Sequence, residues 1–285
     1  MPDPALVERL VRSALDEDSG GGGADLTTEA TVAADRSASG VLLAKQALVV
    51  AGLDVARCAF TLLDPAVVWR AVVPEGASVS PQSVLVGVEG RARALLTAER
   101  VALNFLQRLS GVATITRLFA DAVAGTKARI RDTRKTTPLL RALEKHAVEV
   151  GGGVPHRSGL AAGILVKDNH VRLAGSVGEA TRRAVAAAPP GLVVEIEVEY
   201  LDQVEEALAA GASMLLLDNF TPEDVRKAVA AVAGRVPVEV SGGVTLETVR
   251  AFAEAGPDFI AVGAITHSAP AVDISFEVDT VVDSQ

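Results

Sequence analysis

Short apolar runs alternate with alanine-rich segments of helical periodicity over the second half of the chain. The runs are typical of buried strands, because each is only a few residues long and ends near a polar residue or a glycine; they occupy residues 128–132, 163–167, 193–199, 214–218, 236–241 and 259–263. Segments with apolar residues at helical spacing lie between them, at 176–188, 201–210, 222–233 and 245–255. From Glu197 onwards, one strand and one helix recur about every 22 residues.

This recurrence predicts tandem β–α units and therefore a parallel sheet. The number of units favours a barrel over a doubly wound sheet. Six units are clear, whereas a complete barrel of this kind has eight. We therefore predict an α/β fold with an incomplete parallel α/β barrel of six or seven strands.

Helix boundaries in this half carry the expected end signals. Thr221 and Thr245 each place a hydroxyl before acidic residues, as an N-cap does. Gly211, Gly234 and Gly256 follow the predicted helix ends, where glycine commonly ends a helix.

The first half has a different pattern. Residues 4–18 have helical spacing and lead into a glycine run at 19–23, which we interpret as a mobile surface loop. Three β-type runs follow at 38–50, 67–73 and 84–88, and then a long helical register at 92–125 with Gly111 as a candidate interruption. We place an N-terminal domain at 1–112 and the barrel at 113–269, and expect the tail 270–285 to pack against the N-terminal domain.

Composition excludes several classes of protein. The chain has 285 residues, 49% of them hydrophobic, and a formal net charge of −9, which argues against nucleic-acid binding. No apolar run is long enough to cross a bilayer, and the N-terminus lacks the apolar core of a signal peptide. The single cysteine, Cys58, excludes internal disulfides and suits a reducing compartment, so we expect a cytoplasmic protein without a membrane partner.

Positive charge is concentrated in residues 127–172. This window holds ten Lys and Arg against four acids, a net +6, and the rest of the chain is therefore −15. Three of the four histidines, His146, His156 and His170, lie in the same window. Such a segment is either a solvated surface or a focused site for a small polyanion, and the motifs must decide between them.

The first strand ends supply cations. In a barrel, functional residues lie at the carboxyl ends of the strands. Thr133, Arg134 and Lys135 follow the first strand and Lys167 ends the second, while the glycine-rich loop between them carries His156 and Arg157. Arginine can hold a carboxylate or phosphate with two hydrogen bonds, and lysine acts as a point charge.

The middle strands supply acids. Glu197 and Asp218 lie one strand apart and could hold Mg²⁺ on a diphosphate or accept hydrogen bonds from ribose. Glu195, Glu197 and Glu199 alternate along one strand and share a face, so the pattern alone leaves their individual roles open.

The last strand ends are rich in glycine. This pattern matches a barrel phosphate site, where backbone N–H groups and a helix N-terminus bind an oxyanion. The candidate residues are Ser241, Gly242, Gly243, Val262, Gly263 and Ala264, with His267 as a further candidate.

Several longer motifs together resemble one enzyme family. The blocks are LDEDSGGGGADLTTEA, AERVALNF, IRDTRKTT, GGGVPHR, LVKDNH, LLLDNF, EVSGGV and FIAVGAITHS, and they occur in order over nearly the whole chain. They resemble the quinolinate phosphoribosyltransferases, also called carboxylating nicotinate-nucleotide pyrophosphorylases. This resemblance implies an N-terminal open α/β-sandwich domain, an incomplete barrel, and a homodimer with active sites shared between subunits, with a higher oligomer left open.

The resemblance also implies a reaction and a set of roles. Quinolinate and 5-phosphoribosyl-1-pyrophosphate would react with Mg²⁺ to give nicotinate mononucleotide, pyrophosphate and CO₂. The implied catalytic residues are Lys135, Lys167, Glu197 and Asp218. Carboxylates of quinolinate would contact Arg134, His156, Arg157 and Lys167, and Arg100 would be donated by the other subunit. Thr133 is a further substrate-binding candidate. Glu197 and Asp218 would contact ribose and Mg²⁺, directly or through the diphosphate, and Ser241, Gly242, Gly243 and Gly263 would bind the 5′-phosphate. Val262, Ala264 and His267 are further substrate-binding candidates from the strand-end pattern, with a structural role equally open for His267.

Two other functions remain open from the residues alone. One is a barrel aldolase or isomerase that uses Lys167 as a Schiff-base amine. The other is a paralogue with a shifted substrate or no activity, which loss of the quinolinate-binding cations would mark. All of those cations are present in this chain.

Overall fold

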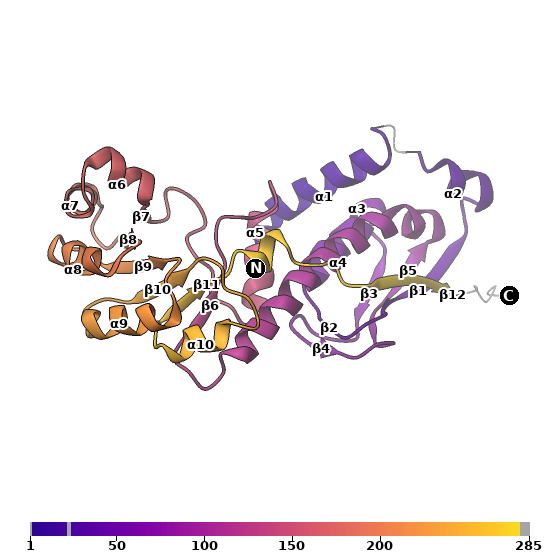
Figure 1. Cartoon of the computed structure of the whole chain (residues 1–285). Helices are drawn as coiled ribbons and strands as arrows, with labels where there is room; N and C mark the ends of the chain where they lie inside the picture. The colour runs from indigo at the N-terminus through magenta and orange to yellow at the C-terminus, as the bar shows by residue number, and fades with distance from the viewer. Residues whose placement is uncertain (1, 22–23, 280–285) are drawn as a thin grey trace. The chain divides into compact units, whose positions relative to one another are not determined.

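The computed structural model describes residues 2–21 and 24–279. The chain divides into two compact units (Figure 1): the first comprises Met1–Ile115, Ala142–Gly151 and Ala269–Gln285, and the second Thr116–Arg141 and Gly152–Ser268. Of the predicted glycine loop at 19–23, residues 22 and 23 lie outside the described residues, as does 280–285 of the tail. Among the described residues, no helix is both long enough and apolar enough to cross a membrane.

The first unit is built on a four-stranded antiparallel sheet in the order β12-β1-β5-β3. The strands are β1 (Ser37–Ala44), β3 (Val68–Ala71), β5 (Val84–Arg91) and β12 (Ile274–Asp279), and β2 (Leu48–Val49) pairs separately with β4 (Ser78–Val79). The helices are α1 (Pro4–Asp18), α2 (Leu26–Thr31), α3 (Leu53–Leu63) and α4 (Ala92–Ala122). Alternation along β1 and β5 directs Leu42 and Leu85 into the core, where they are fully buried with Phe60.

Gly111 does not interrupt α4, contrary to the candidate break at this position. A Cβ atom at Gly111 would lie 2.0 Å from the carbonyl oxygen of Pro270. Glycine is therefore needed here for close packing of the C-terminal segment on the helix. The same segment continues into β12, which pairs antiparallel with β1.

The second unit contains a six-stranded parallel sheet, as the recurrence predicts. Its order is β6-β11-β10-β9-β8-β7, so β6 and β7 are the edge strands and the barrel is incomplete. The strands are β6 (Arg129–Arg131), β7 (Ile164–Val166), β8 (Val194–Val198), β9 (Met214–Asp218), β10 (Val238–Ser241) and β11 (Phe259–Ala261). The helices are α6 (Asp168–Ala174), α7 (Val177–Ala187), α8 (Leu201–Ala209), α9 (Pro222–Val232), α10 (Val249–Glu254) and α11 (Ala264–His267); α5 (Arg141–Val150) belongs to the first unit from Ala142 onwards.

One of the two predicted caps is confirmed. Thr221 caps α9, since its side chain accepts a hydrogen bond from the backbone N–H of Asp224. The prediction for Thr245 is wrong: α10 begins only at Val249, because residues 245–248 form a turn in which the Oγ1 of Thr248 accepts from the N–H of Thr245. The strand ends before α9 and α10 nevertheless remain at the same edge of the sheet.

Candidate active site

A cavity of about 500 Å³ lies at the carboxyl ends of the strands in the second unit. Nine of the residues singled out in the sequence line it: Thr133, Arg134, Lys135, His156, Arg157, Lys167, Glu197, Asp218 and Ser241. Leu165, Asp168, Glu199, Leu216, Glu239 and Ala261 complete the lining. The strand ends therefore bring the predicted cations and acids together in one place.

The other candidates lie beside this lining or in the first unit. Gly263 is adjacent to Lys135, since a Cβ atom at Gly263 would lie 3.2 Å from Lys135 Cδ and equally close to the ring of His267. Gly242 and Gly243 follow the lining residue Ser241, and Val262 and Ala264 flank Gly263. Arg100 lies on α4, and its side chain is 57% exposed.

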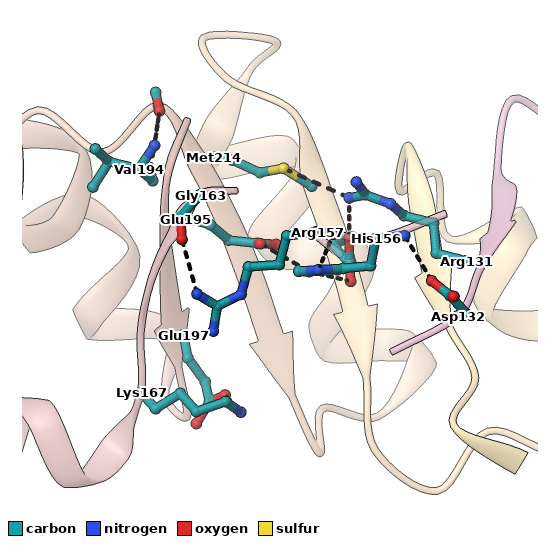
Figure 2. Close-up of polar contacts among 12 residues, drawn as sticks. Arg131, Asp132, His156, Arg157, Gly163, Lys167, Val194, Glu195, Glu197 and Met214 are labelled. Carbon is teal, nitrogen blue, oxygen red and sulfur yellow. Dashed lines mark hydrogen bonds and ion pairs between the residues drawn. The ribbon is translucent and has the colours of Figure 1, made fainter. Parts of the chain in front are cut away.

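One side of the cavity is cationic, and Glu195, the carboxylate whose charge acts on Arg157, forms no ion pair with it. Within the described chain, neither Arg134 nor Arg157 forms an ion pair with an acid, and the Nε atoms of both lack a hydrogen-bond partner. Arg157 donates instead to the carbonyl of Gly163, at 2.8 Å (Figure 2). Burial and then the charge of Arg134 lower the pKa of Arg157 below its ordinary value. Two guanidinium groups that destabilise one another form a site that an anion would stabilise.

Three further lining residues form what we call the outer cluster: Lys167, Glu197 and Asp218. Lys167 Nζ lies 2.8 Å from Glu197 Oε2, and the lysine side chain is 49% exposed. Burial, followed by the negative charge of Glu197, raises the pKa of Asp218. The negative charges of Glu197 and Asp218 are only partly neutralised by the positive charge of Lys167. Such a pair of carboxylates favours the binding of a cation.

A second group of charges lies deeper and forms the inner cluster: Arg131, His156, Glu195 and Glu239. Arg131 Nη1 donates to Glu239 Oε2, and its guanidinium lies over the Phe259 ring with 4.4 Å to the centroid. His156 Nε2 lies 3.1 Å from Glu195 Oε2 and 3.6 Å from Glu239 Oε1. Figure 2 shows His156 and Arg131 together, apart from the contact of Lys167 with Glu197.

Glu239 is the functional-site residue that sequence reasoning missed. It is fully buried, and burial together with the charge of Glu195 raises its pKa to about 7. In the sequence, Glu239 is a single acid between Val238 and Val240 of β10. Because side chains alternate between the two faces of a strand, this pattern normally indicates that the acid is exposed to solvent.

The inner cluster has the ligand types of a metal site but does not fit one. Three ligand atoms of His156, Glu195 and Glu239 lie within 4.8 Å of one another. However, Arg131 already bonds to Glu239, and His156 Nδ1 accepts the backbone N–H of Arg157 at 2.7 Å. These four residues therefore form a buried network of ion pairs and hydrogen bonds. The network positions Arg157 through the hydrogen bond between its backbone N–H and His156 Nδ1.

The cavity lies in a chain whose two halves match two models of one family. The N-terminal domain of quinolinate phosphoribosyl transferase matches residues 25–110, and the C-terminal domain matches residues 112–277. The chain belongs to the quinolinate phosphoribosyltransferase family. The resemblance seen in the sequence motifs is thus confirmed.

Individual members of the quinolinate phosphoribosyltransferase family show the same relationship over the full length. The nicotinate-nucleotide pyrophosphorylase [carboxylating] of Mycobacterium leprae is 46% identical over 274 residues, which is 94% of this chain and 95% of the relative. A probable nicotinate-nucleotide pyrophosphorylase [carboxylating] of Bacillus subtilis is 40% identical over 272 residues, or 95% and 93% of the two chains. The solved structure of the nicotinate-nucleotide pyrophosphorylase from Francisella tularensis superposes with a TM-score of 0.93 at 36% identity and covers 98% of both chains.

Proposed function

We propose that this chain transfers the phosphoribosyl group of 5-phosphoribosyl-1-pyrophosphate to quinolinate and releases pyrophosphate and CO₂ to give nicotinate mononucleotide. The observation that carries the proposal is the cavity itself, in a member of the quinolinate phosphoribosyltransferase family. On its cationic side, Arg134 and Arg157 form no ion pair with any acid that the structure describes, which suits a dicarboxylate. Its acidic side, with Glu197 and Asp218, suits a ribose and its metal-bound diphosphate.

The first step forms the glycosidic bond. The ring nitrogen of quinolinate attacks the anomeric carbon, and the bond from this carbon to pyrophosphate breaks with its electron pair. Positive charge develops on the ribose, and Glu197 would stabilise it electrostatically. Lys135, beside the glycine turn at Gly263, would neutralise the departing pyrophosphate, and the turns at Ser241–Gly243 and Gly263 would hold the 5′-phosphate.

Magnesium fits the acidic side of the cavity. Among the described residues Asp218 Oδ1 has no hydrogen-bond partner, and the pKa of Asp218 is raised by burial and by Glu197. Hard carboxylate oxygens at an uncompensated negative position are the ligands that Mg²⁺ prefers. Glu197 and Asp218 would hold the ion, directly or through the diphosphate, and when bound it neutralises charge on the leaving group.

The second step removes one carboxylate. The bond from the ring carbon to the carboxylate breaks, and the electron pair stays on that carbon beside the positively charged ring nitrogen until a proton replaces CO₂. The protein's part is to hold the other carboxylate in place, through Arg134, Arg157 and Lys167. Since both ring nitrogens of His156 are engaged, we assign it to supporting Arg157 in the ligand-free state.

An assay of products with two substrates tests the proposed function. Quinolinate should give nicotinate mononucleotide, pyrophosphate and CO₂ in equal amounts, whereas nicotinate, which lacks the second carboxylate, should react poorly. Comparable turnover of both acids would contradict the two-carboxylate site. Borohydride trapping in the presence of substrate should leave Lys167 unmodified; a trapped adduct would favour the Schiff-base alternative.

We further propose a homodimer whose active sites include Arg100 of the partner subunit, in the cytoplasm of the cell. Arg100 lies on a largely apolar helix, and its guanidinium is 3.8 Å from Glu99, its single ion-pair partner in the described part of the chain. Mixing Arg100→Ala with Lys167→Ala under subunit exchange should restore up to about a quarter of wild-type activity, by random pairing of protomers. Absence of any rescue, with exchange verified by mass spectrometry of tagged subunits, would place both residues in the same subunit's site.

A further inference from the structure

Asn219 stands at the end of β9 in a backbone conformation that few residues other than glycine adopt. Its φ is 59°, in the left-handed region, directly after Asp218. Asparagine tolerates this region better than other side chains, but the conformation still has to be held by its surroundings. The motif LLLDNF contains Asn219, yet the roles derived above for the proposed reaction use only Asp218 from it.

Two hydrogen bonds hold Asn219 in place. Its side-chain Nδ2 donates to Asp218 Oδ2 at 2.7 Å. Its backbone N–H donates to the carbonyl of Ser241 at 2.9 Å, across to the neighbouring strand β10. Because an ionised carboxylate only accepts hydrogen bonds, the amide must present its nitrogen to Asp218. Oδ2 of Asp218 is thus fixed, and Oδ1 is left for a ligand.

The glycine turn that follows β10 is shaped around this amide. A Cβ atom at Gly242 would lie 2.2 Å from Asn219 Oδ1 and 2.8 Å from Asn219 Cγ. Gly242 also has a φ of +98°. Glycine at this position therefore serves both the turn and the close approach of the Asn219 side chain.

We infer that Asn219 is a positioning residue that joins Asp218 to the Ser241–Gly243 turn and so presets the pocket for the phosphoribosyl substrate. The inference rests on the proposed function. Asp218 and Ser241 line the cavity and pair in register on adjacent strands, whereas Asn219 contacts both from outside the lining. It would therefore act through these two residues, without touching the substrate itself.

The variant Asn219→Gly tests this inference, because glycine keeps the left-handed backbone and removes only the amide. The KM for 5-phosphoribosyl-1-pyrophosphate should rise about tenfold, as expected for loss of a hydrogen bond to a charged group. The KM for quinolinate should stay within about twofold, since the cationic side is untouched. Ala233→Gly is the matched control: Ala233 also has a left-handed φ, 50°, but it lies at the C-terminal end of α9.

A double-mutant cycle provides a second readout. Gly242→Ala should raise the same KM by displacing the Asn219 side chain. In the Asn219→Gly background the extra methyl group should add clearly less, because the two side-chain atoms that it would meet most closely are gone. Its contact with the backbone nitrogen of residue 219, at 2.9 Å, and the strain of the left-handed φ at Gly242 are common to both backgrounds and cancel in the cycle. Fully additive effects of the two changes would overturn the coupling.

The outcomes separate this inference from the proposed function. If wild type forms nicotinate mononucleotide and Asn219→Gly leaves the KM for 5-phosphoribosyl-1-pyrophosphate unchanged, the positioning role is wrong and the function stands. Equal increases in both KM values would also overturn it, because they would indicate a general structural role. A wild-type protein that makes no nicotinate mononucleotide contradicts the proposed function; direct binding of Mg²⁺ and 5-phosphoribosyl-1-pyrophosphate, weakened about tenfold in Asn219→Gly, would still support the positioning role.

Discussion

The inner and outer clusters contain similar groups but differ in burial and in how many of their charges form ion pairs. In the inner cluster, Arg131 and His156 face Glu195 and Glu239, and both acids are almost fully buried. In the outer cluster, Lys167 is half exposed and Asp218 keeps one oxygen without a partner among the described residues. The inner cluster still leaves Arg131 Nε, Glu195 Oε1 and Glu239 Oε1 without hydrogen-bond partners, but its charges are paired with one another and shielded from water. Such a buried network contributes to the fold, whereas incompletely paired charges that are exposed at a cavity can bind and react.

A single strand supplies acids to both clusters. Glu195 and Glu197 lie on the same face of β8, about 7 Å apart along the strand. One contacts His156 and the other Lys167. The position of an acid along β8 thus decides whether its side chain stabilises the fold or takes part in the proposed reaction.

The largest effect is expected from the outer acid of β8. Glu197→Ala should lower kcat about 100-fold, because it removes the carboxylate that would stabilise charge developing on the ribose. Single-turnover measurements of pyrophosphate release would isolate this step. A kcat within fivefold of wild type would remove Glu197 from the proposed chemistry.

The cationic side should affect one substrate only. Arg157→Ala should raise the KM for quinolinate about 10- to 100-fold, since a charge-assisted hydrogen bond contributes roughly 1.5–3 kcal/mol. The KM for 5-phosphoribosyl-1-pyrophosphate should hardly change. Arg183→Ala, which removes an exposed arginine paired with Glu179 on α7, is the control and should match wild type in both values. Unchanged quinolinate affinity in Arg157→Ala would contradict the assignment.

The inner cluster should make stability depend on pH. Because the pKa of Glu239 is raised to about 7, the folded state holds this proton more tightly than the unfolded state does. The resulting stabilisation is complete below the ordinary carboxyl pKa and is lost as the pH rises through about 7. Arg131, Glu195 and His156 face Glu239 in both wild type and variant.

Glu239→Gln removes this titration. Between pH 5 and pH 8, wild type should lose roughly 2 kcal/mol more of its free energy of unfolding than the variant does. Urea denaturation at several pH values measures the difference. Parallel pH profiles for the two proteins would show that Glu239 is ionised throughout.

The smallest effect is expected at Glu199, the acid that directly follows β8. Glu199 follows the strand and is exposed, although it lines the cavity and its charge contributes to raising the pKa of Asp218. Exposure to water screens its interactions, so Glu199→Gln should change kcat less than about threefold and stability by less than about 0.5 kcal/mol. A larger loss of kcat would extend the outer cluster to this residue.

Much of this site could be predicted from sequence, because strand ends are visible in the pattern. The prediction that Arg134, Lys167 and Asp218 share one cavity depends only on parallel strands ending at one edge. What the pattern could not reveal is the depth and facing of Glu195 and Glu239. Val238 and Val240 are buried on one face of β10, and Glu239 is buried on the other face. An alternation of apolar and polar residues normally indicates that one face of the strand is exposed, but both faces of β10 are covered.

Helix boundaries near the site were harder to predict than the strands. The helix α6 starts directly after β7, and its start is capped within the motif: His170 Nδ1 accepts the backbone N–H of Lys167. In the motif LVKDNH, His170 thus has a structural role at the start of α6, which composition and periodicity do not show. The late start of α10 likewise depends on a side-chain contact, between Thr245 and Thr248.

The most direct test of the division between the clusters compares two identical substitutions on one strand. For Glu195→Ala and Glu197→Ala, kcat and the free energy of unfolding should be measured on the same preparations. Glu195→Ala should lower the free energy of unfolding by about 1–3 kcal/mol, because it leaves the buried His156 Nε2 without its nearest acceptor, and kcat should stay within about tenfold of wild type. Glu197→Ala should do the reverse, with a loss of about 100-fold in kcat and less than about 1 kcal/mol in stability, since the half-exposed Lys167 can be hydrated. If both variants lose stability and activity in the same proportion, the position along β8 does not distinguish a stabilising acid from a catalytic one. The division into an inner and an outer cluster would then be wrong.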